Sequence, residues 1–408
     1  MDDVIRQRIE AVRRGEVPEG YKVENHQLHP QDWKTERIGK YLVALDMFSN
    51  DTEQYALATS SRQGLMLQTE YYNDQRFEET TGGFHVVPEG FITYRHMSDD
   101  EVFKFNLNTL GFPVLVSPEY PVFTTTDGLN KHLLLEYLNG MKEFRAFCSA
   151  QKKGSTRTRM YFSRLGEFTM PIPPQEEQSK IAAILTVFDK EIELKRRCIE
   201  ELQSLKKTCL AKMFPRNGSN IPELRFPGFT DPWEQHKVSE VANRFDYLRI
   251  PVAANLRIPG TTPYYGANGI QDYVEGFTHE GEFVLVAEDG ANDLKNYPVK
   301  CVNGRIWVNN HAHVLQSKPD MADNVFLAYS ISQADIEALL VGGGRAKLNA
   351  EVMMGIDLVM PRLQEQIAIG RYLTRLDDLI TLHQRELEDE KKKKKALMQL
   401  LLTGIVRV

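Results

Sequence analysis

The sequence predicts an α+β fold: two mixed α/β domains joined by two long helices that form an antiparallel coiled coil, with a pseudo-two-fold internal repeat. Three observations predict this fold. A proline-led Glu-Gln segment at 173–178 recurs at 361–366, each copy is followed by a long heptad pattern, and each is preceded by short apolar runs separated by Gly, Asn, Asp and Pro. The length of 408 residues gives room for two or three domains.

Composition and charge are those of an ordinary globular protein. Apolar residues make up 42% and charged residues 26%, which excludes wholesale disorder. The 50 basic and 56 acidic residues give a net charge of -6, so any nucleic-acid binding must come from locally concentrated positive charge. The four cysteines lie far apart without a CxxC pair, which argues against a zinc site and favours the cytoplasm. The sequence shows no signal pattern or membrane-spanning stretch, so no membrane association is expected.

The repeat follows two constant shifts in residue number. One shift carries Trp33 onto Trp233, and a shorter one carries Glu177 onto Glu365, so the first half holds a dozen or so more residues between its tryptophan and its prolines. Each half is therefore a variable block followed by a shared segment. The shorter shift, called the helix shift below, also pairs Arg157 with Arg345, Ile181 with Ile369, Asp189 with Asp377 and Lys206 with Lys394.

The repeat also sets the expected domain boundaries. Residues 4–14 read as a short helix like the one that ends near Met213, which would make the chain a cyclic repeat cut inside a helix. The expected divisions are an N-terminal segment (1–30), a first mixed domain (31–170), a central helix (171–215), a second mixed domain (216–358) and a distal helix (359–408).

The shared segments are predicted to be helices of roughly 40 residues, about 60 Å long at 1.5 Å per residue. Prolines suit a helix entrance, and a carboxylate in the first turn complements the helix dipole. Lys195 and His383 interrupt the two apolar seams at matching positions, where polar residues can fix register. The seam residues expected to pack the helices, and to contribute to partner docking, are Ile181, Leu185, Phe188, Ile192, Leu373, Leu376 and Ile380.

These motifs resemble a known family, the specificity (S) subunits of type I restriction-modification systems. The resemblance is carried by both Glu-Gln helix starts, the loops at 154–157 and 342–345, the Leu-Leu-Thr-Gly ending at 401–404, and Tyr-Tyr-Gly-Ala-Asn-Gly at 264–269 followed by Glu-Asp-Gly at 288–290. One departure is Pro361-Arg-Leu, which lacks the double proline of Pro173-Pro174 and leaves the second helix start open.

The resemblance implies a non-catalytic subunit. Its two target-recognition domains would each read one half of a bipartite, asymmetric double-stranded DNA target. Two copies of a methylation subunit would dock on the helices, and restriction subunits would join them. S-adenosylmethionine, ATP and magnesium would belong to those partners, with no cofactor or metal bound by this chain. A rigid helix pair would then fix the number of unread base pairs between the half-sites.

Local charge agrees with DNA binding. Lys152, Lys153, Arg157 and Arg159 lie in a stretch without acids, and the matching loop carries Arg345 and Lys347 beside three glycines. Such loops can bring cations to phosphates, although a solvated loop before a helix is the plain alternative. Candidates for reading base edges are Asn268, Arg305, Asn309, Asn310 and His311, because Asn pairs well with adenine and Arg with guanine. Weaker candidates in the first block are Arg62, Arg76, Arg95 and Lys131.

Other signals do not indicate chemistry. The lysine run at 391–395 follows an acidic stretch and is typical of a solvated helix face. His311-Ala-His313 lacks cysteine or acidic residues at helpful spacing for a metal. No P-loop, dinucleotide fingerprint or methyltransferase motif is recognisable in the sequence. Two alternatives stay open: a coiled-coil adaptor protein, and the recognition subunit of another multi-chain restriction enzyme.

Overall fold

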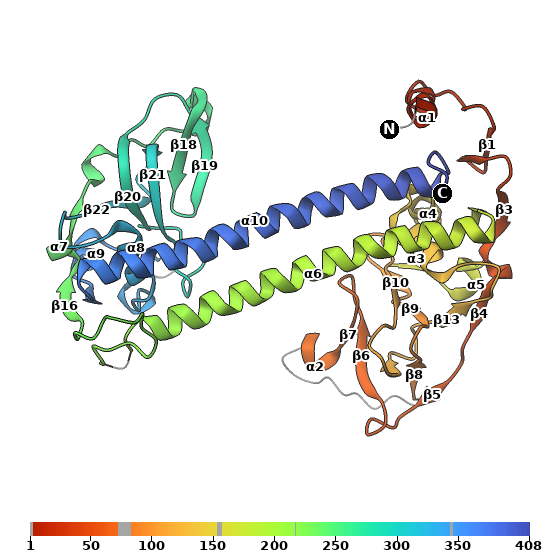
Figure 1. Cartoon of the computed structure of the whole chain (residues 1–408), viewed down its shortest axis with the longest axis horizontal. Coiled ribbons are helices and arrows are strands. Elements are labelled where there is room, and N and C mark those ends of the chain that lie inside the picture. The colour runs from red at the N-terminus through yellow and green to blue at the C-terminus, as the bar shows by residue number, and fades with distance from the viewer. Residues whose placement is uncertain (1–2, 72–82, 153–156, 217, 343–345) are drawn as a thin grey trace. The chain divides into compact units, whose positions relative to one another are not determined.

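In the computed structural model, residues 3–71, 83–152, 157–216, 218–342 and 346–408 are described. The chain forms two compact units, Met1–Lys195 with Glu386–Val408, and Arg196–Arg385. Two long helices, α6 (Gln175–Met213) and α10 (Leu363–Leu402), pass from one unit into the other, so each unit contains part of both helices (Figure 1). The expected fold class, with two mixed domains joined by two long helices, is confirmed.

The two helices run antiparallel within each unit. In the first unit Lys394 Nζ lies 2.6 Å from Asp189 Oδ1, and in the second Lys206 Nζ lies 2.5 Å from Asp377 Oδ1. The helix shift carries Asp189 onto Asp377 and Lys206 onto Lys394, so these are two copies of one ion pair. The second helix start is also settled, since the same shift carries Gln175 onto Leu363 despite the missing proline.

The predicted seam residues all face inward. Ile181, Leu185, Leu373, Leu376 and Ile380 are buried, while Phe188 and Ile192 are half-buried. The polar interruption at Lys195 is an ion pair between the helices, with Nζ 2.8 Å from Glu386 Oε2. Seam residues near the helix ends belong to the domain cores, so the helices pack on the domains as well as on each other.

The first unit combines two main sheets with short helices. The helices are α1 (Asp3–Arg13), α2 (Gln68–Tyr71), α3 (Lys131–Gly140), α4 (Lys142–Ser149) and α5 (Phe162–Leu165). Its core gathers large aromatic and aliphatic residues around Trp33, Tyr94 and Phe123 and extends to Ile181 of α6 and Leu401 of α10. One sheet has the order β11 (Phe105–Leu107), β9 (Ile92–Tyr94), β13 (Val122–Thr125), β4 (Leu42–Ala44), and the other β5 (Phe48–Ser49), β8 (Phe84–Val87), β12 (Val114–Val116), β6 (Ala56–Ser60), β7 (Leu65–Leu67). Smaller ladders pair β1 (Tyr21–Glu24) with β2 (Gln27–Pro30), and β10 (Met97–Ser98) with β14 (Thr158–Arg159).

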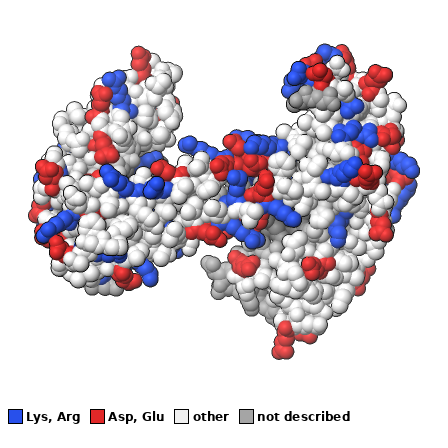
Figure 2. Space-filling model, viewed as in Figure 1, with Lys and Arg blue, Asp and Glu red and all other residues white. Residues whose placement is uncertain are grey.

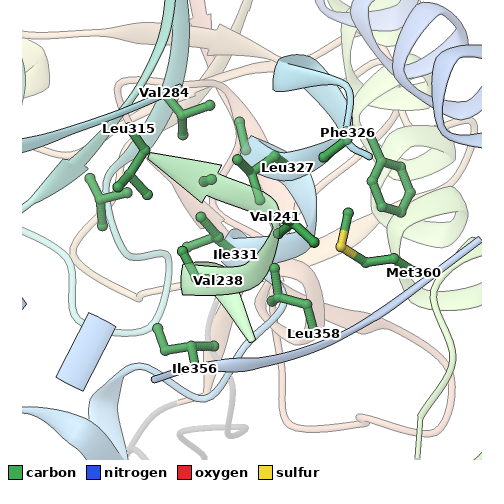
Figure 3. Packing of buried hydrophobic residues seen from close by; sticks show 14 of the residues in the cluster. Val238, Val241, Val284, Leu315, Phe326, Leu327, Ile331, Ile356, Leu358 and Met360 are labelled. Atoms are coloured by element: carbon green, nitrogen blue, oxygen red, sulfur yellow. The ribbon is translucent and has the colours of Figure 1, made fainter. Parts of the chain in front are cut away.

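The second unit contains one larger sheet. Figure 3 shows its core, where Val284 and Leu315 of the sheet meet Leu327 and Ile331 of α8. The sheet order is β17 (Ala242–Arg244), β22 (Ala312–Ser317), β20 (His279–Ala287), β21 (Val299–Val308), β18 (Pro259–Gly266), β19 (Gly269–Val274), and the helices are α7 (Val238–Val241), α8 (Asn324–Ser332) and α9 (Ala350–Met354).

Each domain begins and ends in a two-stranded ladder. In the first unit β3 (Lys34–Arg37) pairs with β15 (Thr169–Ile172), and in the second β16 (Glu234–Lys237) pairs with β23 (Asp357–Met360). The registers match: the pair of positions 34 and 172 becomes 234 and 360 when each position is moved by its own shift of the repeat. The extra residues of the first half therefore lie inside its domain, beyond this ladder.

The repeated glutamine fastens each domain helix to a long helix. Gln178 Oε1 accepts from the amide of Asn130 at 2.8 Å, and its Nε2 donates to the carbonyls of Gly128 and Pro173. Gln366 repeats the arrangement with the amide of Asp323 and the carbonyls of Met321 and Pro361. Asn130 and Asp323 are the N-caps of α3 and α8. Each glutamine thus satisfies a buried capping loop that would otherwise lose its hydrogen bonds.

The glutamate before each glutamine is buried as well. Glu177 accepts from Trp33 Nε1 at 3.0 Å and from Arg407 at 2.6 and 2.9 Å. Glu365 accepts two hydrogen bonds from Arg225, at 2.7 and 2.8 Å. The helix dipole was the expected reason for these carboxylates, and the structure adds buried ion pairs with Arg407 and Arg225.

The N-terminal helix is present but separate. α1 is exposed or half-buried along its length, and Arg8 Nη1 donates to the carbonyl of Ile405 at 3.1 Å. A cyclic repeat cut inside a helix would suggest that α1 extends α10. Figure 1 shows α1 almost end-on where α10 is seen lengthwise, so α1 does not continue α10 in a straight line.

Replacing Gln366 with methionine should destabilise the second unit. The change keeps the side-chain volume but leaves one amide and two carbonyls without their partner, which we expect to cost about 2–4 kcal/mol in the free energy of unfolding. Hydrogen exchange at the amides of Asp323 and Phe326, together with urea unfolding, would measure it. Gln364→Met, two residues away on an exposed position of α10, is the control. Equal stability of both variants would contradict the assignment.

Candidate nucleic-acid interface

The basic stretch of the first domain lies against an acidic loop. Lys152 Nζ is 2.7 Å from Glu101 Oε1, and Arg157 Nε is 2.7 Å from Asp99 Oδ1. Arg159 lies on β14, which pairs with β10 through Met97. Lys153 lies outside the described residues, as does Arg76. The sequence suggested a stretch free of acids, whereas the fold brings to it acids that lie 51 and 58 residues earlier in the chain.

The second domain repeats this arrangement. Lys347, onto which the helix shift carries Arg159, forms a bridge with Asp289, and its Nζ lies 2.8 Å from Glu288 Oε1. The next residues match too. The amide of Met160 donates to the backbone carbonyl of His96, and the amide of Leu348 donates to the backbone carbonyl of Glu288, both at 2.8 Å. Arg345 lies outside the described residues. In both domains the predicted basic segment is therefore paired with an acidic loop.

Three of the predicted base-reading residues hold the loop around residues 288–292. Asn268 donates to the carbonyl of Gly290 and accepts from the amide of Asn292, both at 2.9 Å. Asn309 is buried and accepts from the amide of His311, whose Nδ1 lies 2.5 Å from Asp289 Oδ1. Asn310 is exposed. Three of these candidates thus make internal contacts at one loop.

The remaining basic candidates lie elsewhere. Arg305 on β21 faces Glu280 across the ladder, with Nε 3.0 Å from Oε1, and its guanidinium lies 4.8 Å from the Phe277 ring centroid. Lys131 donates to the carbonyl of Gly90 at 2.9 Å. Arg62 contacts Asp100. These three residues do not belong to the group around residues 288–292.

A buried charge network supports the loop of the second domain. His313 Nδ1 is 2.6 Å from Asp246 Oδ2, and its Nε2 is 2.9 Å from the carbonyl of Leu348. Arg249 Nη1 lies 2.6 Å from Glu288 Oε2. Burial alone would raise the pKa of Asp246, but hydrogen bonds from His313 and the Val314 amide lower it below its usual value.

This network also has the donor set of a metal site. Ligand atoms of Asp246, Glu288 and His313 lie within 4.8 Å of one another. The sequence offered no acidic partner at a helpful spacing for His311 and His313, and the fold brings Asp289 to His311 and Asp246 to His313 from other segments. Arg249 and Lys347 already supply positive charge to both carboxylates, so the residues do not require a metal ion.

The lysine run on α10 is neutralised locally, as expected for a solvated face. Lys391, Lys392 and Lys393 each pair with an acid three residues earlier. Lys394 differs, because it reaches both Asp189 of α6 and Glu136 of α3. Figure 2 shows basic and acidic residues intermingled along the helices on this face.

The ion pair of Lys394 has a counterpart in the second unit. There Lys206 pairs with Asp377, which also accepts from the Tyr329 hydroxyl of α8 at 2.5 Å. Glu136 and Tyr329 thus occupy corresponding positions on the two domain helices. Burial raises the pKa of Glu136, and the charge of Lys394 opposes that rise. In each unit, one lysine and one aspartate tie both long helices to the domain helix.

Two dissimilar domains are carried on a duplicated helical scaffold, and each domain has a basic segment beside an acidic one. The family model for the type I restriction modification DNA specificity domain matches residues 72–204 and 230–390, and the chain belongs to this family. Among the helices that the structure describes, none combines the length and apolarity needed to cross a membrane.

Known proteins agree with this family. The chain is 24% identical over 425 residues to the type I restriction enzyme MjaVIII specificity subunit of Methanocaldococcus jannaschii, which covers 95% of this chain and 97% of that protein. It is 41% identical over 164 residues, 40% of this chain and 42% of the relative, to a protein of Haemophilus influenzae assigned as type I restriction enzyme specificity subunit S.HindORF215P. The S subunit structure from M. genitalium is similar with a TM-score of 0.66 over 93% of this chain and 97% of that one, at 14% identity, and this likeness shows the fold.

Alanine substitutions should separate internal contacts from surface ones. Asn309→Ala removes hydrogen bonds to the His311 amide and to Gln271 from a buried side chain, so we expect a loss of about 1–2 kcal/mol in the free energy of unfolding. Asn310→Ala, at the adjacent exposed position, should change it by less than about 0.5 kcal/mol. Thermal unfolding of both variants checks this. Equal effects would show that Asn309 does not hold the loop.

Proposed function

We propose that this chain is the DNA specificity subunit of a type I restriction-modification complex. Each mixed domain reads one half of a bipartite double-stranded target, and the helix pair docks methylation and restriction subunits. The observation that carries this proposal is the duplicated basic position, Arg159 and Lys347, which forms equivalent backbone bridges, to Met97 in the first domain and to Asp289 in the second. Cations at these positions suit contacts to phosphates beside the bases that are read.

The unlike sheets of the two domains support an asymmetric target. The first domain has four-stranded and five-stranded sheets, and the second has one six-stranded sheet. Different surfaces would read different base sequences. The two-stranded neck ladders, β3 with β15 and β16 with β23, join each domain to its helices in the same register. The chain would recognise DNA without breaking bonds, and the methylation and restriction subunits would supply S-adenosylmethionine, ATP and magnesium chemistry.

The helices support docking of two methylation subunits. The seven seam residues are not exposed, so they cannot provide the docking surface by themselves. Leu194 is 65% exposed, and Leu382, its counterpart under the helix shift, is 48% exposed. Two equivalent exposed apolar positions suit two copies of one partner. Restriction subunits would join the assembled methylation complex.

Selection of DNA by the assembled complex tests the function. This chain and its methylation subunit would be mixed with random duplexes over a salt series, and retained duplexes sequenced. We expect log affinity to fall linearly with log salt, because bound phosphates release counterions, and retained duplexes to share two short motifs at a constant separation. The chain alone with DNA and magnesium should neither cleave nor methylate. A single contiguous motif, or no motif, would sink the proposal.

Charged residues on the helices should block partner docking without unfolding the chain. The double variant Leu194→Lys with Leu382→Lys alters exposed positions, so thermal stability should change little while affinity for the methylation subunit falls at least about tenfold. Leu256→Lys with Leu224→Lys, at positions that are 69% and 45% exposed, is the control matched for side-chain size and number of charges. Size-exclusion chromatography and calorimetry measure assembly. Full assembly of the double variant would rule out this docking surface.

A further inference from the structure

Three consecutive acids of the first domain each hold one basic residue. Asp99 pairs with Arg157, Asp100 with Arg62 and Glu101 with Lys152. Arg62 comes from one part of the chain and Lys152 and Arg157 from another, and the loop at residues 99–101 brings them together. Such an arrangement of carboxylates offers the cations what a row of DNA phosphates would offer: acceptor oxygens and negative charge.

A polar cleft of about 420 Å³ lies beside this loop. It is lined by Arg62, Asp99, Arg95 and Lys104, together with polar groups that include Gln63 and Tyr71. Arginine and glutamine side chains can form paired hydrogen bonds with base edges. The cleft therefore combines groups able to read bases with cations at its margin, and the acidic loop is part of its wall.

Two of the three ion pairs at this loop are well exposed to solvent. Arg62 and Asp100 are 64% and 50% exposed, and Arg157 and Asp99 are 56% and 70% exposed. Exposed pairs contribute little stability, so opening them for another anion demands little. In the second domain Glu288, whose carbonyl takes the place of the His96 carbonyl, is only 13% exposed and also holds Arg249, so its ion pairs are part of the core network. Of the two loops, that of the first domain thus has the character of a releasable contact.

The loop is held in a defined conformation. Asp100 Oδ1 accepts from Ser98 Oγ at 2.9 Å and from the amide of Val102, in addition to Arg62. The Arg62 guanidinium lowers the pKa of Asp100 to about 2, so this carboxylate is charged at neutral pH. Asp100 therefore competes with phosphate as a fully ionised group.

We propose that the mouth of this cleft is the DNA contact of the first domain and that residues 99–101 form an electrostatic gate over it. This inference rests on the proposed function. In free protein the carboxylates of the gate hold Arg62, Lys152 and Arg157, and in the complex the phosphates of the duplex take the place of those carboxylates. On random DNA the exchange gives little net attraction. On the cognate half-site, base contacts in the cleft add to the exchange, so the gate increases discrimination.

Removing the acidic charge tests the gate. In the complex with methylation subunits, Asp99→Asn, Asp100→Asn and Glu101→Gln together keep the side-chain shapes and free the cations. Affinity for a duplex without the target should rise about tenfold at low salt, and the preference for the target should fall. The control neutralises three other exposed acids of this domain, Glu53→Gln, Glu89→Gln and Asp127→Asn, so that net charge changes equally. It should change affinity less than about twofold.

Removing the cations provides the second arm. Arg62→Gln, Lys152→Gln and Arg157→Gln together should lower the slope of log affinity against log salt by up to about 2.7, from about 0.9 for each phosphate contact. If the acid variant matches its control and the salt slope is unchanged while wild type still selects its target, the gate is wrong and the proposed function stands. If the wild-type complex selects no duplex, both fall.

Discussion

The contacts at the start of each long helix fix how that helix is joined to its domain. There a buried glutamine and a buried glutamate need hydrogen-bond partners. The glutamine bonds to the N-cap loop of the domain helix and to the carbonyl of the proline that precedes the long helix. The glutamate pairs with an arginine from a distant segment. Buried polar groups without partners are costly, so the loop, strand and helix can adopt only one mutual arrangement. The neck ladders β3·β15 and β16·β23 lie directly before these helices, and each domain is then built between the two strands of its ladder.

Much of this scaffold could be predicted from the sequence because it is periodic or repeated. Heptads identify the inward faces of α6 and α10, and the two shifts of the repeat correspond to strand registers that match between the halves. The sheets could not be predicted in the same way. Strands such as β5 and β10 have two residues each, and their partners lie far away in the sequence, so no local periodicity encodes the strand order. Their positions depend on long-range packing, which the sequence expresses only through the whole core.

The candidate site shows the same division between local and distant information. Clustered lysines and arginines are visible in the sequence, and they do lie on matching segments of both domains. Their acidic partners at residues 99–101 and 288–289 are not visible, since a stretch without acids can still fold against one. Asn268 and Asn309 illustrate a related point: amide side chains that are suited to adenine are equally suited to holding a loop, and the fold shows hydrogen bonds of the second kind.

Comparison of the two halves indicates what duplication keeps and what it leaves free to change. The Asp–Lys pair that joins the long helices is the same in both units, but the domain helix meets it with Glu136 in one and with Tyr329 in the other. A carboxylate beside one lysine and one aspartate needs a second cation, and Lys104 lies close enough to influence Glu136 electrostatically. A neutral hydroxyl needs none. The aspartate and lysine on the long helices thus stay the same because their charges balance. The residue from the domain helix can vary as long as the total charge of the cluster remains zero. A scaffold with that property can carry two unlike domains without changing how either is attached.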